Sequence, residues 1–240
     1  MGRRHQSNEL EHFVQTMSLQ VPPRVSTKNN FDDLLFPQDH VSRRATDTYF
    51  YDANTVLRTH TTAHQVELLK AGHGAFLVSG DVYRRDDIDA RHYPIFHQMD
   101  GVRIFSHEEY VKSGFKDSFE QFVVHELKND LEGLAKTLFG QNVPARWIDA
   151  FFPFTDPSME LEINFQDNWL EVLGCGVVQR PIMKSVGFDT SKHLGYAFGL
   201  GLERLAMVLF DIPDIRLFWS EGLCAISQKK NVNDCRCSVY

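Results

Sequence analysis

The sequence has no long apolar run, few cysteines and no excess of positive charge. None of its apolar stretches approaches the roughly 18 residues that a membrane-spanning helix requires, and its polar opening residues hold no apolar signal core. We therefore expect neither a membrane segment nor a secretory signal peptide, and at most a vestige of an organelle transit peptide. Four cysteines among 240 residues favour free thiols in a reducing compartment over a disulfide scaffold. A net charge of −7 argues against a protein that grips nucleic acid by positive charge alone.

The composition that remains, 42% hydrophobic and 24% charged, is that of an ordinary globular protein with one large domain. Residues 117–140 give the clearest helix pattern, because apolar side chains recur at three- and four-residue steps. Asp117 with Glu120 resembles a capping box at its start. A second helix pattern begins at Thr61 or Thr62, either of which can act as the N-cap.

Strand-like runs predict two hairpins. Residues 75–84 and 96–105 are rich in β-branched and aromatic side chains, and they flank a charged segment. Apolar and polar side chains alternate over residues 159–165, and a second strand begins at Trp169. Residues 196–213 pass from a strand through glycines into a helix that a proline would end. Strands in series with helices set against them predict an α+β fold with an antiparallel sheet flanked by helices.

The segment between the first two strands, GDVYRRDDIDARHYPIFHQMDG, concentrates charge. Arg84 and Arg85 end the first strand, and an arginine fork suits phosphate and carboxylate oxygens because two N–H groups meet two oxygens at once. Charge neutralisation at a hairpin tip would explain the same residues. His92 and His97 have neither a nearby cysteine nor the regular spacing of a metal site. A hairpin loop longer than about five residues is usually functional or disordered, which favours a site here.

Glycines and aromatic residues mark two further candidates. GLGLER, residues 199–204, lacks the third glycine of a dinucleotide fingerprint because Glu203 stands there, which excludes a Rossmann-type oxidoreductase. The alternative is a purely structural role, in which the two glycines allow the strand and the helix to pack tightly. Phe152 and Phe154 flank a proline and would face the same side of an extended run. They could form the walls of an apolar pocket, or they could pack in the core.

Taken in chain order, FHQMDG, FPFTDPS, WLEVLGCG and GLGLER follow an arginine-bearing hairpin. This ordered set resembles the catalytic domain of the phenylalanyl-tRNA synthetases, in particular their organellar (mitochondrial) single-chain form, over residues 22–219. The resemblance implies the class II synthetase-type antiparallel sheet flanked by helices. It further implies a catalytic domain over residues 1–219. Residues 220–240 would form a divergent tail in place of the anticodon-binding domain of the organellar form.

The reaction implied by the resemblance is the ATP-dependent activation of phenylalanine to phenylalanyl-adenylate, followed by transfer to tRNA(Phe) in mitochondrial translation. The implied partners are ATP with Mg²⁺, L-phenylalanine and tRNA(Phe), without a membrane, and the implied location is the mitochondrial matrix. Monomer and dimer both stay open. Asp100 replaces the family's more frequent glutamate, which shortens its reach toward the substrate ammonium by one methylene. An alternative is a non-catalytic class II-like module or inactive isoform that binds phenylalanine or a partner without turnover.

By the same resemblance, Arg84 is the motif 2 arginine on the α-phosphate and substrate carboxylate, and Arg204 is the motif 3 arginine on the γ-phosphate side. Glu171 would face ATP and its Mg²⁺, with Glu160 and Glu162 as strand neighbours. Which of these carboxylates touches the metal stays open. The remaining residues implied to bind substrates are His60, Thr62, Ala63, His64, Gln65, Arg91, His92, Tyr93, Gln98, Met99, Asp100, Phe152, Phe154 and Phe198.

Overall fold

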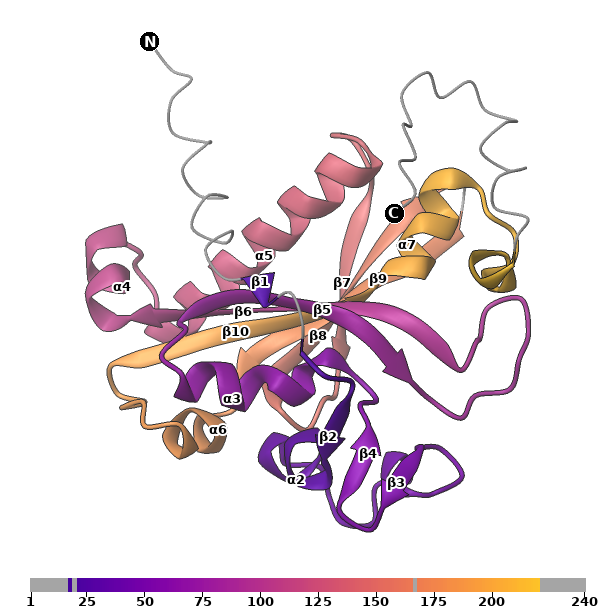
Figure 1. Ribbon diagram of the computed structural model, residues 1–240. Helices are drawn as coiled ribbons and strands as arrows, with labels where there is room; N and C mark the ends of the chain where they lie inside the picture. Colours follow the sequence, from indigo (N-terminus) through magenta and orange to yellow (C-terminus); the bar gives the residue numbers. More distant parts are fainter. Residues whose placement is uncertain (1–16, 19–20, 166–167, 221–240) are drawn as a thin grey trace.

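A computed structural model describes residues 17–18, 21–165 and 168–220 of the chain (Figure 1). Its centre is a seven-stranded sheet in the order β1-β5-β6-β10-β9-β8-β7. Every neighbouring pair is antiparallel except β1 with β5, which is parallel. The predicted α+β fold with an antiparallel sheet is therefore confirmed. The strands of this sheet are β1 (Met17–Ser18), β5 (Ala75–Tyr83), β6 (Ile95–Ser106), β7 (Ala145–Ala150), β8 (Thr155–Phe165), β9 (Asn168–Val178) and β10 (His193–Gly201).

Both predicted hairpins are present. β5 and β6 pair from Ala75 opposite Arg103 to Tyr83 opposite Ile95, which leaves residues 84–94 as the charged connection between them. β8 and β9 pair as well, although their turn lies partly outside the described residues. The helices and short 3₁₀ helices (η) are α2 (Thr27–Asn30), η1 (Asp32–Leu34), η2 (Val41–Arg43), η3 (Thr61–His64), α3 (Gln65–Lys70), α4 (His107–Ser113), α5 (Phe119–Phe139), α6 (Arg180–Ser185), α7 (Leu202–Phe210) and η4 (Ile215–Trp219).

Helix α5 covers one face of the sheet, above it in Figure 1, and its apolar side packs into a core shared with β6, β8, β9 and β10. This confirms the periodic pattern of residues 117–140. The predicted cap is wrong by one residue, because Ser118 accepts a hydrogen bond from the backbone of Gln121, whose side chain accepts one in return. Asp117 therefore precedes the cap, and the helix begins at Phe119.

Helices α3 and α6 lie on the opposite face of the sheet (Figure 1) and enclose a second core with β5, β6 and β10. The predicted helix at Thr61 or Thr62 opens instead with the 3₁₀ helix η3, so its α-helical part begins only at Gln65. A 3₁₀ turn at a helix start is common. It changes the direction of the side chains at residues 61–64, which bears on the site described below.

A small three-stranded sheet in the order β2-β4-β3 lies beside these helices, with β2 (Arg24–Ser26), β3 (Phe50–Asp52) and β4 (Thr55–Leu57). Its core contains Val25, Phe31 and Val56. Residues 31–52 show no helix or strand pattern in the sequence, yet they include η1, η2 and β3. Each of these elements is only three residues long, which is too short to produce a periodic pattern.

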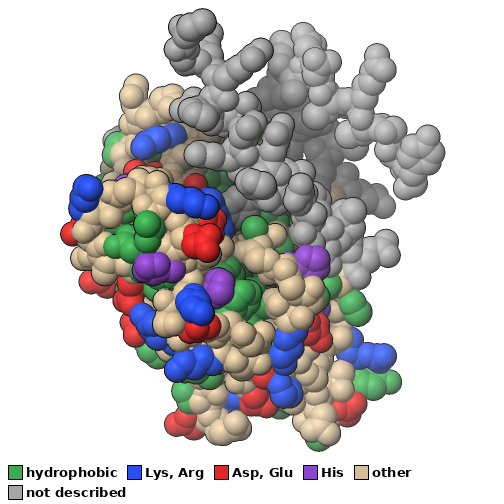
Figure 2. Space-filling view, turned by 90° about the vertical axis from the view of Figure 1, so that its left-hand side faces the viewer, with side chains coloured by type: hydrophobic (Ala, Val, Ile, Leu, Met, Phe, Trp, Pro, Cys, Tyr) green, Lys and Arg blue, Asp and Glu red, His purple; other side chains and the backbone are tan. Residues whose placement is uncertain are grey.

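Helix α7 follows β10 directly and ends at Phe210, because the next residue, Asp211, adopts the left-handed conformation (φ 54°), two residues before Pro213. The described helices include none that is both long and apolar enough to cross a bilayer. Figure 2 shows the side of the molecule that carries α4, where acidic, basic and histidine side chains are intermixed. The described residues on that side therefore form no broad patch of positive charge for a polyanion.

Candidate active site

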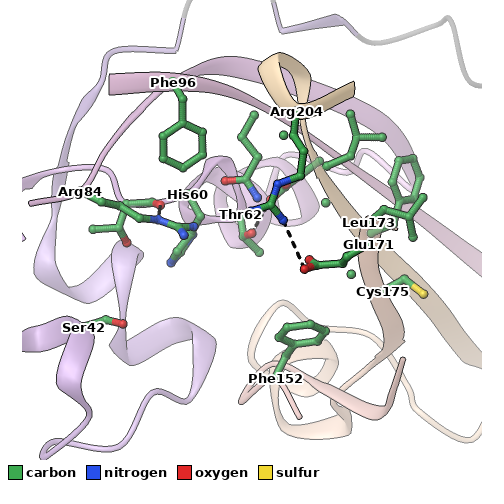
Figure 3. Close-up of a pocket in the computed structure, with 18 of the residues that line it drawn as sticks. Ser42, His60, Thr62, Arg84, Phe96, Phe152, Glu171, Leu173, Cys175 and Arg204 are labelled. Atoms are coloured by element: carbon green, nitrogen blue, oxygen red, sulfur yellow. Dashed lines mark hydrogen bonds and ion pairs between the residues drawn. The ribbon is translucent and has the colours of Figure 1, made fainter. Parts of the chain in front are cut away.

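A cavity of about 580 Å³ lies where β6, β9 and β10 meet the 84–94 connection and residues 151–155 (Figure 3). Its size is within the range of small-molecule sites. Residues 36–48 close another side of it. Most of the predicted site residues line this cavity, namely His60, Thr62, Gln65, Arg84, Arg91, His92, Tyr93, Gln98, Asp100, Phe152, Phe154, Glu171, Phe198 and Arg204.

Aromatic rings form one part of the cavity wall. Phe152 and Phe154 lie in the connection between β7 and β8, with ring centroids 5.9 Å apart and planes 18° from parallel. Phe36 extends the wall, 5.9 Å from Phe154. Gly174 on β9 faces Phe152 so closely that a Cβ there would lie 2.7 Å from its Cζ. Because rings favour offset or edge-on contact with other rings, this part of the cavity suits an aromatic side chain.

A polar group of side chains lies on β6 and η3, beside β10. Gln98 and Asp100 alternate along β6 and therefore face the same side. Asp100 accepts a hydrogen bond from the hydroxyl of Thr62. Gly199 pairs with Asp100 in the neighbouring strand, and a Cβ on this glycine would lie 2.6 Å from Asp100 Oδ1. The first glycine of GLGLER is thus required by close approach, whereas the space around Gly201 is open.

The buried position of these groups changes their electrostatics. Asp100 is only 4% exposed, and burial raises its pKa to about 6, against the lowering effects of Thr62 and the positive charge of Arg84. Within the described residues, both amide atoms of Gln65 and the Oε1 of Gln98 are buried without a hydrogen-bond partner. Buried polar atoms are rarely left unpaired. This end of the cavity therefore suits a ligand that carries charged and hydrogen-bonding groups.

His60 separates the polar group from the aromatic wall. Its ring stacks on Phe36, with centroids 5.6 Å apart and planes 4° from parallel, and lies 6.3 Å from Phe154. Burial, followed by the positive charge of Arg84, lowers the pKa of His60 to about 3. The ring is therefore neutral at physiological pH, when it can donate and accept hydrogen bonds but carries no charge.

Two arginines face the cavity from different elements (Figure 3). Arg84 follows β5, where its Nε donates to the carbonyl of Thr59 at 3.1 Å and its Cζ lies 5.1 Å from the ring centroid of Phe96. Burial lowers the pKa of Arg84, although an arginine side chain keeps its proton in proteins. Arg204, in the first turn of α7, donates to Glu171 of β9 at 3.3 Å. Two permanent cations around one cavity suit a ligand with several phosphate oxygens.

The 84–94 connection is organised by Asp89. Its Oδ1 accepts hydrogen bonds from the backbone N–H groups of Arg91 and His92 at 2.6 and 2.7 Å. Its carboxylate also contacts Nδ1 of His92 at 2.9 Å. These bonds, the His92 ring first, lower the pKa of Asp89 to about 2. Part of the acidity of this segment thus orders the connection that presents Arg91 and His92 to the cavity.

Three predicted substrate-binding residues lie outside the cavity lining: Ala63, His64 and Met99. Met99 lies between Gln98 and Asp100, so strand alternation turns it to the opposite face, where it packs against the core under α5. Ala63 packs in the core of the small sheet. His64 points to Arg58, whose Nη1 lies 3.0 Å from its Nε2. These three side chains therefore lie behind the cavity lining, and a role for residues 63 and 64 would fall to their backbone atoms.

Several lining residues were missed from the sequence. Phe36, His40 and Thr48 line the cavity from a stretch with no periodic pattern, so the sequence held no signal for them. Phe96 also lines it, and its position two residues before Gln98 on the same strand would have revealed it by alternation. Ile215 reaches the cavity from η4, beyond the last predicted motif.

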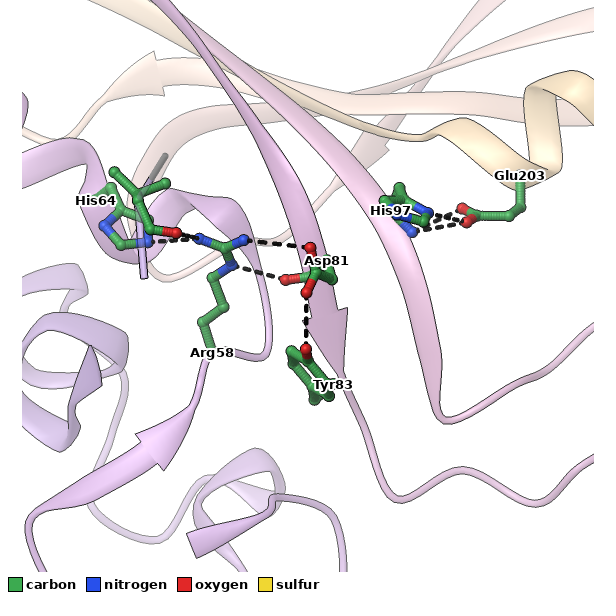
Figure 4. A network of polar contacts seen from close by, with 7 residues as sticks. Arg58, His64, Asp81, Tyr83, His97 and Glu203 are labelled. Atoms are coloured by element: carbon green, nitrogen blue, oxygen red, sulfur yellow. Dashed lines mark hydrogen bonds and ion pairs between the residues drawn. The ribbon is translucent and has the colours of Figure 1, made fainter. Parts of the chain in front are cut away.

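A buried arginine holds η3 in place from behind the cavity (Figure 4). Arg58 is 2% exposed, and its guanidinium donates to the backbone carbonyls of Asp81 at 2.7 Å and Val21 at 3.0 Å. Because arginine can only donate, the Nε2 of His64 must accept in this contact. Burial, together with the charge of Arg58, lowers the pKa of His64, although Glu67 opposes this. The contacts fix η3, and with it Thr62, against β5.

Acidic residues near the cavity do not form a metal cluster by themselves. Among the described residues, no group of three or more His, Cys, Asp or Glu side chains could hold a metal ion. Of the three carboxylates expected to face ATP, Glu171 lines the cavity, whereas Glu162 pairs with Arg146 of β7 at 2.6 Å. Glu160 lies outside the lining. Its pKa is raised by burial and by the negative charges of Glu171 and Glu162.

Comparison with known proteins defines the class. A family model for the tRNA synthetases class II core domain (F) matches residues 5–229 of the chain. A solved structure of pyrrolysyl-tRNA synthetase from Desulfitobacterium hafniense has a similar fold, with a TM-score of 0.60 at 12% identity, covering 87% of this chain and 67% of that one. The chain therefore belongs to the class II tRNA synthetases.

Within this class, the sequence relatives are phenylalanine–tRNA ligases. The chain is 58% identical over 214 residues to the chloroplastic/mitochondrial enzyme of Arabidopsis thaliana, covering 89% of this chain and 48% of that protein. It is 52% identical over 224 residues to the mitochondrial enzyme of Mus musculus, covering 84% and 49%. The phenylalanine–tRNA ligase alpha subunit of Synechocystis is 35% identical, with 95% and 67% covered. The resemblance found in the motifs is thus confirmed, and the chain spans about half the length of its organellar relatives.

Proposed function

We propose that this chain is the catalytic part of a phenylalanine–tRNA ligase, which activates phenylalanine with ATP and transfers it to tRNA(Phe). The observation that carries the proposal is one cavity that unites Arg84 and Arg204 with a buried carboxylate, Asp100, and with the aromatic wall of Phe152 and Phe154. A phosphate-rich nucleotide needs the two arginines, and an aromatic amino acid needs the carboxylate and the aromatic wall. The names of the relatives support the same activity.

Adenylate formation requires little covalent chemistry from the protein. A carboxylate oxygen of phenylalanine attacks the α-phosphorus of ATP, the bond to the bridging oxygen breaks, and pyrophosphate leaves. No base is needed, because the attacking carboxylate is already ionised at neutral pH. Catalysis therefore depends on positioning and on positive charge around the pentacoordinate phosphate. We assign the α-phosphate and the substrate carboxylate to Arg84, and the γ-phosphate side to Arg204.

The amino acid is assigned to the polar and aromatic parts of the cavity. The ammonium group pairs with Asp100, which is held by Thr62, and the buried Oε1 of Gln98 accepts a further hydrogen bond. A bound cation favours the ionised carboxylate, so the substrate itself offsets the raised pKa of Asp100. The benzyl ring lies against Phe152 and Phe154. Exclusion of a tyrosine hydroxyl rests on space alone, which typically gives modest discrimination.

Magnesium arrives with ATP as part of the substrate. Mg²⁺ usually takes one or two protein carboxylates and completes its shell with phosphate oxygens and water. The cavity fits this demand, because Glu171 lines it beside Arg204. We assign the contact with the ion to Glu171, whose carboxylate offers hard oxygen ligands and offsets the charge of Arg204 when no nucleotide is bound.

The proposal extends to the organisation and location of the protein. Residues 1–219 are assigned to the catalytic domain, and residues 220–240, nearly all of them outside the described residues, to a divergent tail, of which the class II family model still covers residues 220–229. The acyl acceptor is the terminal ribose of tRNA(Phe). The mitochondrial matrix is assigned as the location, because relatives from Mus musculus and Dictyostelium discoideum are named mitochondrial enzymes.

Phenylalanine-dependent exchange of labelled pyrophosphate into ATP tests the activation step without tRNA. We expect exchange by the wild-type chain and a loss of roughly 100-fold or more on Arg84→Ala, which is typical for a charge that stabilises a transition state. Arg85→Ala is the matched control, because Arg85 is adjacent but donates to the carbonyl of Ala45 outside the cavity. That variant should retain exchange.

Each result decides between the alternatives. Exchange that is equally strong in both arginine variants would contradict the role of Arg84. A wild-type chain that binds phenylalanine in calorimetry but shows no exchange would instead support the non-catalytic module. Tyrosine in place of phenylalanine measures how far the aromatic wall alone discriminates.

A further inference from the structure

The 84–94 connection carries nucleotide-side residues, and it is anchored at its start by Arg85. The backbone N–H and the guanidinium of Arg85 donate to the carbonyls of Asp47 and Ala45, both at 2.9 Å. Arg91 and His92, at the far end, are exposed, and the bonds made by Asp89 join the tip of the connection only to itself. A long connection between two strands is mobile unless other elements hold it. The question is therefore what fixes its position relative to the sheet and to α7.

The 3₁₀ helix η4 packs on the back of this connection. The backbone N–H of Ile215 donates to the carbonyl of Ala90 at 3.0 Å, and Ile215 is buried. At the other end of η4, the ring of Trp219 stacks on Tyr93, with centroids 5.5 Å apart and planes 12° from parallel. In Figure 1, η4 follows α7 and lies next to the β5–β6 connection. Two separate points of η4 thus hold two separate points of the connection.

Trp219 also joins this connection to the helix that carries Arg204. Its ring stacks on His97 of β6 at 5.8 Å with planes 4° from parallel. The Nδ1 of His97 lies 2.5 Å from Glu203, and the backbone N–H of His97 donates to the same carboxylate (Figure 4). Glu203 is 5% exposed and precedes Arg204. The indole of Trp219 therefore contacts both Tyr93 of the connection and His97 of β6, and His97 is bonded to Glu203 of α7.

We propose that Trp219 is a positioning residue. It holds the 84–94 connection against β6 and α7, so that Arg91 of the connection and Arg204 of α7 face one ligand. Trp219 does not line the cavity itself, whereas Tyr93, Arg91 and Arg204 do. The proposal deepens the proposed function, because it assigns a support to the same nucleotide site. Removing the ring frees the connection and weakens ATP binding, while the phenylalanine pocket on the other side of the cavity stays intact.

The first test uses proteolysis and does not depend on catalysis. Trypsin cuts after Arg91 only when the connection opens, so the rate of fragments ending at Arg91, identified by mass, measures its mobility. We expect Trp219→Leu, which keeps apolar bulk but loses the ring, to raise this rate roughly tenfold, the scale of lost aromatic stacks. Trp219→Phe, which restores a ring, should lie close to wild type. Equal rates in all three chains would overturn the proposal.

The matched control is Trp169→Leu. Trp169 is 40% exposed, against 41% for Trp219, and it lies over Arg146 at 4.0 Å, away from the connection. Its replacement should leave cleavage after Arg91 unchanged. If Trp169→Leu accelerates cleavage as much as Trp219→Leu, the effect reports general loosening, and the positioning role is refuted.

Kinetics supply the second test. In pyrophosphate exchange, Trp219→Leu should raise the KM for ATP roughly tenfold and leave the KM for phenylalanine within about twofold, with rescue by Trp219→Phe. Equal rises in both KM values would indicate a purely structural role and contradict the proposal. If the wild-type chain shows no exchange, the proposed function fails, but the proteolysis test still decides whether Trp219 holds the connection.

Discussion

Replacing Asp100 by asparagine should stabilise the fold while it weakens the binding of phenylalanine. Asparagine has the same shape and can accept the hydrogen bond from Thr62, but it needs no counter-charge. Asp100 is 4% exposed, and its pKa is raised from 3.8 to about 6, chiefly by burial. The ionised carboxylate therefore costs folding free energy, and only a bound cation recovers that cost.

The sign and size of the effect follow from the pKa. A carboxyl group whose pKa is raised in the folded state contributes its full stability below its unfolded value of 3.8 and loses it as the pH rises through about 6. Each pKa unit corresponds to about 1.4 kcal/mol. The penalty on wild type is then roughly 3 kcal/mol at pH 8 and about half of that at pH 5. Asp100→Asn should gain at most these amounts, since the buried amide has its own desolvation cost.

Urea unfolding followed by circular dichroism at several pH values between 5 and 8 measures the difference between the two chains. The stability gain should grow with pH and level off above pH 7. Asp149→Asn, at an exposed position of the edge strand β7, is the control and should change the stability by less than about 0.5 kcal/mol. In pyrophosphate exchange, Asp100→Asn should raise the KM for phenylalanine roughly 10- to 100-fold, the value of a hydrogen bond to a charged group.

Two results would refute this reasoning. A stability difference that is constant from pH 5 to pH 8 would mean that Asp100 does not titrate with a raised pKa. A variant that is less stable than wild type at pH 8 would mean that the carboxylate, and not its shape, holds η3 to β6. An unchanged KM for phenylalanine would separately remove Asp100 from the ammonium site.

Two further substitutions test the support of the site. Arg58→Met should lower the unfolding free energy by about 2–4 kcal/mol, because buried carbonyl acceptors lose their donor. The control Arg44→Met, at an exposed position, should change it by less than about 0.5 kcal/mol. Equal urea midpoints of the two variants would contradict this expectation. Gly174→Ala places a methyl group 2.7 Å from Phe152, so the ring must move, and the KM for phenylalanine should rise roughly tenfold. An unaltered KM for phenylalanine would mean that the ring yields freely.

The sequence predicted the elements whose residues lie close together in the chain. The periodicity of α5 and the alternation in β8 were sufficient because burial on one face repeats along each element, and the β-branched and aromatic content of β5 and β6 marked these two strands. The start of α5 was misplaced by one residue, because Asp117 and Ser118 are both favourable caps. The elements of residues 31–52 are too short to repeat, so Phe36 and its stack on His60 could not be foreseen.

Most site residues expected from the family motifs line one cavity, and the three that do not differ in the direction of their side chains. Met99 was grouped with its neighbours although strand alternation alone would have turned it away. Ala63 and His64 were included because the family resemblance covers the whole turn from Thr62 to Gln65, whereas the side chains of both residues are buried away from the cavity lining. The contacts of Arg58 span 23 and 37 residues, and no local pattern indicates partners at that distance.

The register of β6 against β10 connects these observations. Asp100 pairs with Gly199 and Gln98 with Gly201, so the strand that supplies the polar groups lies beside the one that opens into α7 and Arg204. A shift by one residue would bring Met99 into the cavity and bury Asp100 in the core under α5. A side chain at position 199 would meet the carboxylate of Asp100 at 2.6 Å. Gly199 therefore does more than allow a tight turn, because it leaves room for the buried carboxylate to which we assign the ammonium group of phenylalanine.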